Sequence, residues 1–276
     1  MSETQRIAVE KFRTLHAAGC FVLPNPWDVG SAVYLQHVGF KALATTSSGF
    51  AFTKGLLDET PSVDDVLAHC RDIAQATPLP VNADFRHGYA DDPSGVAENV
   101  TRCIDTGVAG LSIEDSTGNT AEPLYDIQLA VERIKAARHA IDASGIPVVL
   151  TGRCEAFLTR DRNAFIVSLQ RLTAYAEAGA DCLFAPGVTD ASQIEEIVKE
   201  VSPKPVNVLV SRPDANLTVA GLADLGVRRI SVGSALARVA WGSFMRAAQS
   251  IADTGKFDSL GEGAAFTELT KVFERS

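Results

Sequence analysis

The sequence lacks any long apolar run and any cluster of basic residues. No stretch approaches the ~18 apolar residues that a membrane-spanning helix needs, and residues 1–19 lack the apolar core of a signal peptide. Lysine and arginine number 25 against 34 acidic residues, which gives a net charge of -9. This balance argues against nucleic acid or an anionic membrane surface as a partner. We therefore predict a cytoplasmic protein that acts on a small molecule.

Cysteine and lysine are missing from the positions that two other kinds of protein require. The five cysteines are an odd number without a Cys-x-x-Cys pair, which predicts free thiols in a reducing compartment rather than a disulfide scaffold. No lysine ends an expected strand, although a Schiff-base aldolase of barrel type needs one there. Both classes are therefore disfavoured.

Short apolar runs, separated by helical segments, recur along the 276 residues. Several of the runs are apolar on both faces, which is typical of parallel strands covered on both sides. Thr60-Pro61 and Asp92-Pro93 each predict a helix start, because a capping side chain precedes a proline. The expected strands cover about 20–24, 41–46, 80–84, 109–114, 147–151, 181–185, 205–209 and 228–232.

This alternation predicts an α/β fold, a single (β/α)8 barrel of TIM type over residues 1–276, because roughly 250 residues are typical of such a barrel. Two helical stretches, 234–253 and 263–275, follow the eighth expected strand. One helix completes the barrel. The second of these C-terminal helices, which together cover about 234–276, is surplus, and we expect it to dock on a neighbouring subunit of a homo-oligomer.

Polar residues gather where the apolar runs stop. In a parallel barrel the carboxyl ends of the strands form the catalytic face, so these residues are the candidate site. Oxygen ligands such as Asp84 and Glu114 suit Mg²⁺, with Mn²⁺ as a substitute, but they equally suit helix caps or pairs with Arg153. The strand-end residues are Asn25, Ser47-Ser48-Gly49, Asp84, Glu114-Asp115, Arg153 and Asn207.

Arg153 and the Ser47-Ser48-Gly49 turn have the chemistry to bind an anion. A guanidinium at a barrel mouth holds a carboxylate through two parallel hydrogen bonds, although an ion pair with Glu155 or Glu114 is the structural alternative. Small residues let backbone N–H groups approach an anion closely, although such turns are commonly ordinary loops. Cys154 is expected to face away from the site, because neighbouring strand residues point to opposite faces.

A resemblance to a known family rests on three segments: VNADFRHGYADDPSGVAENV, GLSIED and LTGRCEAF. In this order the chain resembles the isocitrate lyase/phosphoenolpyruvate mutase family. The resemblance implies a tetramer with exchanged C-terminal helices and an enzyme that forms an enolate of a 2-oxo acid. For the metal, the resemblance implies that Asp84 binds Mg²⁺, that Glu114 and Asp115 support the ion through water, and that Asp58 lies near it. For the substrate, it implies that Arg153 binds the carboxylate, that Ser47-Ser48-Gly49 binds the carboxylate and the oxo oxygen, and that Asn207 lines the pocket.

Two features depart from the family pattern. Arg86 stands where the family usually has a second acidic residue, and the segment STGNTAEPLY at 116–125 lacks the Lys-x-Cys-Gly-His motif of the lyases. Arg86 either turns outward and leaves a weaker Mg²⁺ site, which we favour, or points inward and binds a second anionic group of the substrate. His87 is the one histidine near the expected site and a candidate acid/base group.

These observations lead to one main hypothesis. We expect a Mg²⁺-dependent lyase or decarboxylase that cleaves a C–C bond in a small 2-oxo or 2-hydroxy dicarboxylate, with Asp58, Glu114 and Arg153 as catalytic residues. Two alternatives stay open: a phosphonopyruvate-type mutase or hydrolase that acts on a P–C bond, with Arg86 binding the phosphonate, and a non-catalytic 2-oxo acid binding protein.

Overall fold

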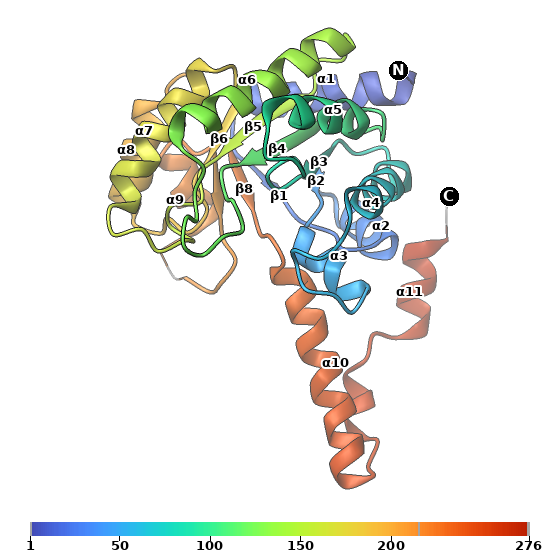
Figure 1. Ribbon diagram of the computed structural model, residues 1–276. Coiled ribbons are helices and arrows are strands. Elements are labelled where there is room, and N and C mark those ends of the chain that lie inside the picture. The colour runs from blue at the N-terminus through green and yellow to red at the C-terminus, as the bar shows by residue number, and fades with distance from the viewer. Residues whose placement is uncertain (1, 215, 275–276) are drawn as a thin grey trace.

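Eight parallel strands form one sheet that curls into a barrel, surrounded by helices (Figure 1). The computed structural model describes residues 2–214 and 216–274. In the order β1-β8-β7-β6-β5-β4-β3-β2, the strands from β2 to β8 each pair with the next one in the chain, β1 pairs with β8, and β1 and β2 form the two ends of the sheet. The prediction of a (β/α)8 barrel is confirmed. The strands are β1 (Phe21–Leu23), β2 (Leu43–Ala44), β3 (Val81–Asp84), β4 (Gly110–Glu114), β5 (Val149–Arg153), β6 (Cys182–Phe184), β7 (Val206–Leu209) and β8 (Arg229–Ser231).

Capping side chains fix where several helices begin. Asp92 accepts the N–H of Gly95 and precedes Pro93, the first residue of α5, as predicted. The helix start expected at Thr60-Pro61 is wrong, because Ser62 and Asp65 cap each other two residues later. The helices are α1 (Glu3–Ala17), α2 (Val29–Val38), α3 (Ser47–Thr53), α4 (Val63–Ala76), α5 (Pro93–Ile104), α6 (Ile127–Ser144), α7 (Ala164–Glu177), α8 (Ala191–Glu200), α9 (Val219–Asp224), α10 (Ala235–Thr254), η1 (Asp258–Glu262) and α11 (Phe266–Phe273).

Asn25 joins the first strands to the last. Its side-chain oxygen accepts the N–H groups of Val232 and Gly233 at 3.0 and 2.9 Å, and its Nδ2 donates to the carbonyl of Thr45 at 2.8 Å. The N–H of Ala44 also donates to the carbonyl of Pro24 at 3.0 Å. These bonds tie β1, β2 and the end of β8 together, so Asn25 closes the barrel.

Helix α1 covers the amino ends of β4 and β5. Gln5 donates through Nε2 to the carbonyls of Ile104 and Val108, just before β4, and Arg13 donates to the carbonyl of Pro147, just before β5. Phe12 is fully buried beside Gly110, where a side chain larger than glycine's would clash with it. The amino end of the barrel is thus filled by side chains, which leaves the carboxyl end as the open one.

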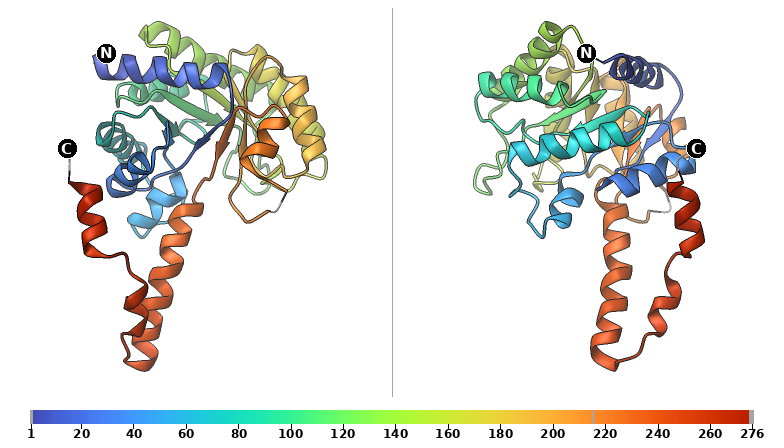
Figure 2. Two further views of the ribbon diagram at one scale, coloured as in Figure 1. Left: turned by 180° about the vertical axis from the view of Figure 1, so that it is seen from behind. Right: turned by 90° about the vertical axis from the view of Figure 1, so that its right-hand side faces the viewer.

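The C-terminal part of the chain extends away from the barrel. Helix α10 projects outward, the chain turns through η1, and α11 returns beside the barrel near α2 (Figure 2). We call residues 235–274 the arm. The two predicted C-terminal helices correspond to α10 and α11, while positions 275–276 of that prediction lie outside the described residues. Within the described part of the chain, none of the helices combines the length and apolarity that crossing a bilayer requires.

Candidate active site

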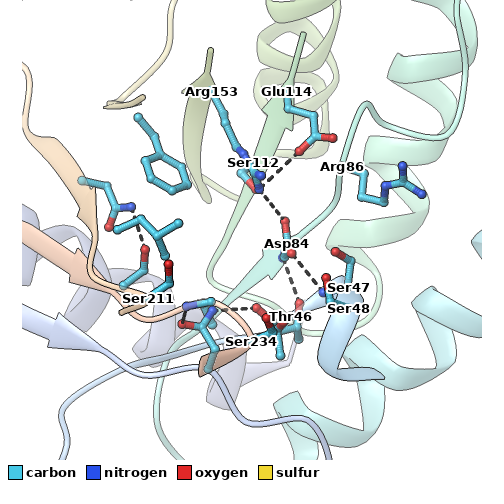
Figure 3. Close-up of a pocket in the computed structure, with 18 of the residues that line it drawn as sticks. Thr46, Ser47, Ser48, Asp84, Arg86, Ser112, Glu114, Arg153, Ser211 and Ser234 are labelled. Carbon is cyan, nitrogen blue, oxygen red and sulfur yellow. Dashed lines mark hydrogen bonds and ion pairs between the residues drawn. The ribbon is translucent and has the colours of Figure 1, made fainter. Parts of the chain in front are cut away.

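Asp84, Glu114 and Arg153 are the last residues of three successive strands, β3, β4 and β5. The parallel register pairs Glu114 with Arg153, and their side chains meet at the carboxyl end of the barrel. One guanidinium nitrogen of Arg153 lies 3.1 Å from Asp84 Oδ1 and 3.2 Å from Glu114 Oε2 (Figure 3). The structure therefore brings together the three residues on which the sequence-based hypothesis depends.

A third carboxylate completes this charged cluster. Glu155 accepts a hydrogen bond from Arg153 Nε at 2.5 Å and lies in the loop after β5. Burial raises the pKa of Glu114 to about 8, even though Arg153 acts in the opposite direction. Burial disfavours the charged form of Arg153, but the three carboxylates outweigh it and raise its pKa. Arg153 is thus the permanent positive charge among three nearly buried acids.

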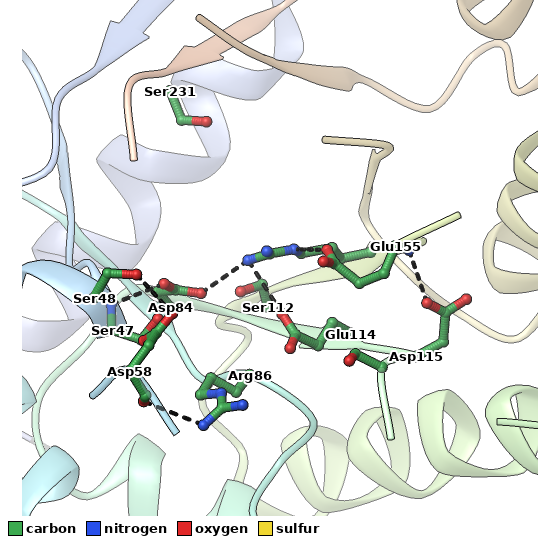
Figure 4. Close-up of polar contacts among 12 residues, drawn as sticks. Ser47, Ser48, Asp58, Asp84, Arg86, Ser112, Glu114, Asp115, Glu155 and Ser231 are labelled. Atoms are coloured by element: carbon green, nitrogen blue, oxygen red, sulfur yellow. Dashed lines mark hydrogen bonds and ion pairs between the residues drawn. The ribbon is translucent and has the colours of Figure 1, made fainter. Parts of the chain in front are cut away.

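The second carboxylate oxygen of Asp84 forms a hydrogen bond at the start of α3. Asp84 Oδ2 accepts the backbone N–H of Ser47 at 3.0 Å, and the neighbouring Ser48 hydroxyl donates to Asp58 Oδ2 at 2.6 Å (Figure 4). The other oxygen of Asp58, Oδ1, is buried and has no hydrogen-bond partner. An unsatisfied buried carboxylate oxygen is costly without a partner such as a cation or an ordered water.

These donors fit a Mg²⁺ ion that keeps most of its water ligands. Across residues 2–214 and 216–274, no three His, Cys, Asp or Glu side chains converge as ligands of one ion. Mg²⁺ needs only one or two protein carboxylates, because it retains several waters. Asp84 together with the unpartnered oxygen of Asp58 meets this requirement, and both Asp84 and Glu114 also contact Arg153.

Two strand-end residues lie elsewhere than expected. Asp115 points away from the mouth, where its carboxylate accepts hydrogen bonds from Tyr175 at 2.6 Å and Arg171 at 3.1 Å on α7. Its role is structural, because it ties β4 to α7. Gly49 does not border the cavity, since its N–H caps α3 through Thr46 Oγ1 at 3.3 Å. Gly49 instead packs closely against Trp27, and its predicted substrate-binding role stays a prediction.

The side chain of Arg86 neither turns fully outward nor points at the carboxylate cluster, the two outcomes that were expected for it. Its backbone is left-handed, with φ of 45°, and its side chain borders the mouth of the barrel. The guanidinium donates to the carbonyl of Asp58 at 3.2 Å and lies 4.0 Å from Glu59 Oε1. Arg86 is thus held by the loop that carries Asp58, and it forms no ion pair with Asp84 or Glu114.

The remaining candidates for proton transfer lie outside the site. His87 does not border the cavity, and burial lowers its pKa to about 4. Cys154 is fully buried against Ser168 of α7, as expected from its strand position. The 116–125 loop closes on itself through a bridge between Ser116 and Leu124, and it meets the cavity at Ser116. Among the described residues that line the cavity, there is no cysteine, histidine or lysine.

The mouth of the barrel encloses a cavity of about 360 Å³, a size suited to a small metabolite. Asn207 lies in its wall, where its Nδ2 donates to Ser231 at 2.9 Å. Several polar residues of the wall, among them Ser112, Arg229 and Ser231, were not predicted, and Glu155 was expected only as an ion-pair partner of Arg153. A signal was present for Arg229, because an arginine inside a short apolar strand is unusual. The cavity is lined by Asn25, Ser47, Ser48, Asp58, Asp84, Arg86, Ser112, Glu114, Arg153, Glu155, Asn207, Arg229 and Ser231, among others.

A parallel barrel with charged residues converging at its carboxyl end defines a (β/α)8-barrel enzyme. The family model described as phosphoenolpyruvate phosphomutase matches residues 12–252. The chain therefore belongs to the phosphoenolpyruvate mutase/isocitrate lyase family, as the motifs predicted, and the expectation of an enzyme is confirmed.

Individual relatives agree with this assignment. A solved structure from Burkholderia cenocepacia J2315, described as a candidate lyase or mutase, is 42% identical, with a TM-score of 0.95 over 99% of this chain and 98% of the other. The structure of a 2,3-dimethylmalate lyase is 25% identical, with a TM-score of 0.85 over 99% and 95%. The oxaloacetate decarboxylase of Pseudomonas entomophila L48 is 28% identical, over 81% of this chain and 78% of that protein.

Proposed function

We propose that this protein is a Mg²⁺-dependent lyase or decarboxylase that cleaves a C–C bond in a small 2-oxo or 2-hydroxy dicarboxylate. The observation that carries the proposal is Arg153, held between Asp84, Glu114 and Glu155 at the cavity wall. Binding of a 2-oxo acid requires one group for its carboxylate and another for its oxo oxygen, and a fixed guanidinium beside the proposed metal position supplies both.

The chain's own residues position the substrate. Arg153 directs its guanidinium at the substrate carboxylate, while Ser47 and Ser48 at the start of α3 present polar groups to the same region. In a decarboxylation the electrons of the broken bond pass into the 2-oxo group as an enolate, CO₂ leaves, and the enolate carbon takes a proton. Because the cavity lacks cysteine, histidine and lysine among the described residues, we assign this proton to a carboxyl group or a water molecule.

Asp84 would hold Mg²⁺, with Asp58 assisting through its unpartnered oxygen. When bound, the ion would supply Lewis-acid stabilisation of the negative charge that develops on the oxo oxygen. Glu114, predicted as the second metal ligand, lies beside Asp84 through their shared contact with Arg153, and Glu155 holds the same guanidinium.

The test is product formation from a panel of acids. We expect the purified protein with Mg²⁺ to release pyruvate or another 2-oxo acid from oxaloacetate or from a short 2-alkylmalate, and EDTA to abolish the release. Phosphonopyruvate belongs in the panel because the matching family model is named for a phosphomutase. Turnover of phosphonopyruvate alone, followed by phosphorus NMR, would replace the C–C lyase with the P–C alternative.

We also propose that the protein forms a homo-oligomer through the arm. Many apolar side chains of α10, η1 and α11 are exposed, and α10 projects away from the barrel (Figure 2). Burying such a surface against a second copy removes it from water. The exposed apolar residues of the arm include Val239, Trp241, Phe244, Met245, Phe257, Leu260, Phe266 and Leu269.

Light scattering after size exclusion tests this assembly. We expect the wild-type protein to run as a dimer or tetramer and the double variant Phe244→Glu, Met245→Glu to shift towards the monomer, because charges would be forced into the apolar contact. Ile166→Glu is the matched control, since Ile166 is similarly exposed but lies on α7. A wild-type protein of monomeric mass would refute the assembly.

A further inference from the structure

Arg229 is a buried arginine whose guanidinium bonds to uncharged groups. It is the first residue of β8 and only 2% exposed. Its guanidinium bonds to three uncharged groups: Asn207 Oδ1 at 3.0 Å, Thr151 Oγ1 at 3.1 Å and His16 Nε2 at 3.3 Å. In the part of the chain that the structure describes, no aspartate or glutamate forms an ion pair with it.

His16 does not supply the missing negative charge. Its Nδ1 lies 2.7 Å from the carbonyl of Phe12 and must carry the proton there, which leaves Nε2 as an acceptor for Arg229. Burial lowers the pKa of His16 to about 3, and the charge of Arg229 adds to this effect. His16 is thus neutral near pH 7, and the charge of Arg229 is uncompensated.

The cavity is divided by charge. All of its carboxylates come from the β2 to β5 side, where Arg153 and Arg86 lie among them. The described wall residues of β1, β6, β7 and β8 include no acid, and Ser231 of β8 stands apart from the carboxylate cluster (Figure 4). On this second side Arg229 borders the cavity with unused donors, since a guanidinium has five N–H groups and three bonds are accounted for.

Burial alone does not make an arginine a binding group, as Arg133 shows. Arg133 is also buried, but its guanidinium bonds to the carbonyls of His87, Ala90 and Asp91 and lies 4.1 Å from the ring of Tyr125. These bonds hold the loop before α5, and Arg133 does not border the cavity. Arg229 differs because it borders the cavity and bonds only to uncharged groups, and a buried charge of this kind is stabilised by an incoming anion.

We propose that Arg229 binds the second anionic group of the substrate, a carboxylate that reaches the inner end of the cavity, and thereby selects dicarboxylates over monocarboxylates. The inference rests on the proposed function for the reacting end of the substrate, which lies at Arg153 and Asp84. The two arginines then bind opposite ends of one small dianion. Arg86 is less suited to the second carboxylate, because the loop at Asp58 and Glu59 already engages its guanidinium.

The test compares the binding of malonate, an unreactive dicarboxylate, with that of pyruvate, by calorimetry in the presence of Mg²⁺. In Arg229→Met we expect the affinity for malonate to fall by about tenfold to hundredfold, the usual effect of losing a charged hydrogen bond, while pyruvate binding is unchanged. The melting temperature of the free variant should equal or exceed that of the wild type, because a buried unpaired charge has been removed. Arg133→Met is the control and should lower the melting temperature without changing the ratio of the two affinities.

Unchanged malonate affinity in Arg229→Met, or an equal loss for both ligands, would overturn the inference. If the methionine variant does not fold, a crystal of the wild-type protein soaked with malonate decides: a carboxylate within hydrogen-bond distance of Arg229 supports the inference, and malonate bound at Arg153 alone refutes it. These measurements need no turnover. Absence of C–C cleavage with the malonate preference intact would refute the proposed reaction only.

Discussion

Replacing Arg153 with methionine is expected to abolish measurable turnover, a loss of at least about 10²–10³-fold, and to lower the free energy of unfolding by about 3–5 kcal/mol. Both effects have one cause. Asp84, Glu114 and Glu155 lie within 2.5–3.2 Å of the guanidinium and are each less than one-fifth exposed. Without Arg153 three carboxylates would face one another in a poorly solvated cavity, and the substrate carboxylate would lose its binding group.

Urea unfolding at pH 8 and pH 5 separates this mechanism from a simple loss of packing. Burial already raises the pKa of Glu114 and Glu155, and without Arg153 to oppose it both groups take up protons more readily as the pH falls, which relieves the repulsion. The difference in stability between wild type and variant should therefore be smaller at pH 5 than at pH 8. A difference independent of pH would indicate that Arg153 acts mainly through packing against Phe184, whose ring lies 5.3 Å away.

Arg171→Met is the matched control for this experiment. Arg171 also pairs with a buried carboxylate, Asp115, at 3.1 Å, but it lies on α7 and does not border the cavity. Its loss should lower stability while leaving the turnover of folded protein close to that of the wild type. Turnover by Arg153→Met at the wild-type rate would contradict the role proposed for Arg153.

The barrel is the feature that the sequence predicts best. Each expected strand overlaps an observed one, because strands covered on both faces are apolar throughout and stand out from amphipathic helices. The ends of the strands are predicted less accurately. Strand β2 covers Leu43–Ala44 rather than 41–46, because only these two residues pair in register with β3. The helix start at Thr60-Pro61 fails for a local reason, because Ser62 offers a reciprocal cap with Asp65.

The sequence predicts only those site residues that lie at the carboxyl ends of the expected strands. Asp84, Glu114 and Arg153 meet because parallel strands all end at one rim. Asp115 follows Glu114 directly, but adjacent residues point to opposite faces of a strand, so its carboxylate goes to α7. A site position for Arg229 could not be predicted from strand ends, because Arg229 is the first residue of β8 and borders the cavity from inside the barrel.

Arg86→Asp is expected to increase the affinity for Mg²⁺ by about tenfold or more. The substitution removes a positive charge from the mouth of the barrel and adds a negative one, and two charges about 4 Å apart interact by ~1–4 kcal/mol depending on screening. The backbone favours the change, because Arg86 has φ of 45° and aspartate adopts left-handed conformations more readily than arginine. Calorimetric titration of Mg²⁺ with oxalate present measures the effect.

Arg86→Asn is the matched control, since asparagine tolerates the same backbone and removes the positive charge without adding a negative one. Its Mg²⁺ affinity should fall between those of the wild type and Arg86→Asp. Equal affinities in all three proteins would show that the charge at this position does not reach the metal site. A loss of dicarboxylate binding in both variants, with Mg²⁺ affinity unchanged, would instead make Arg86 the group that binds the second carboxylate, and would move that role away from Arg229.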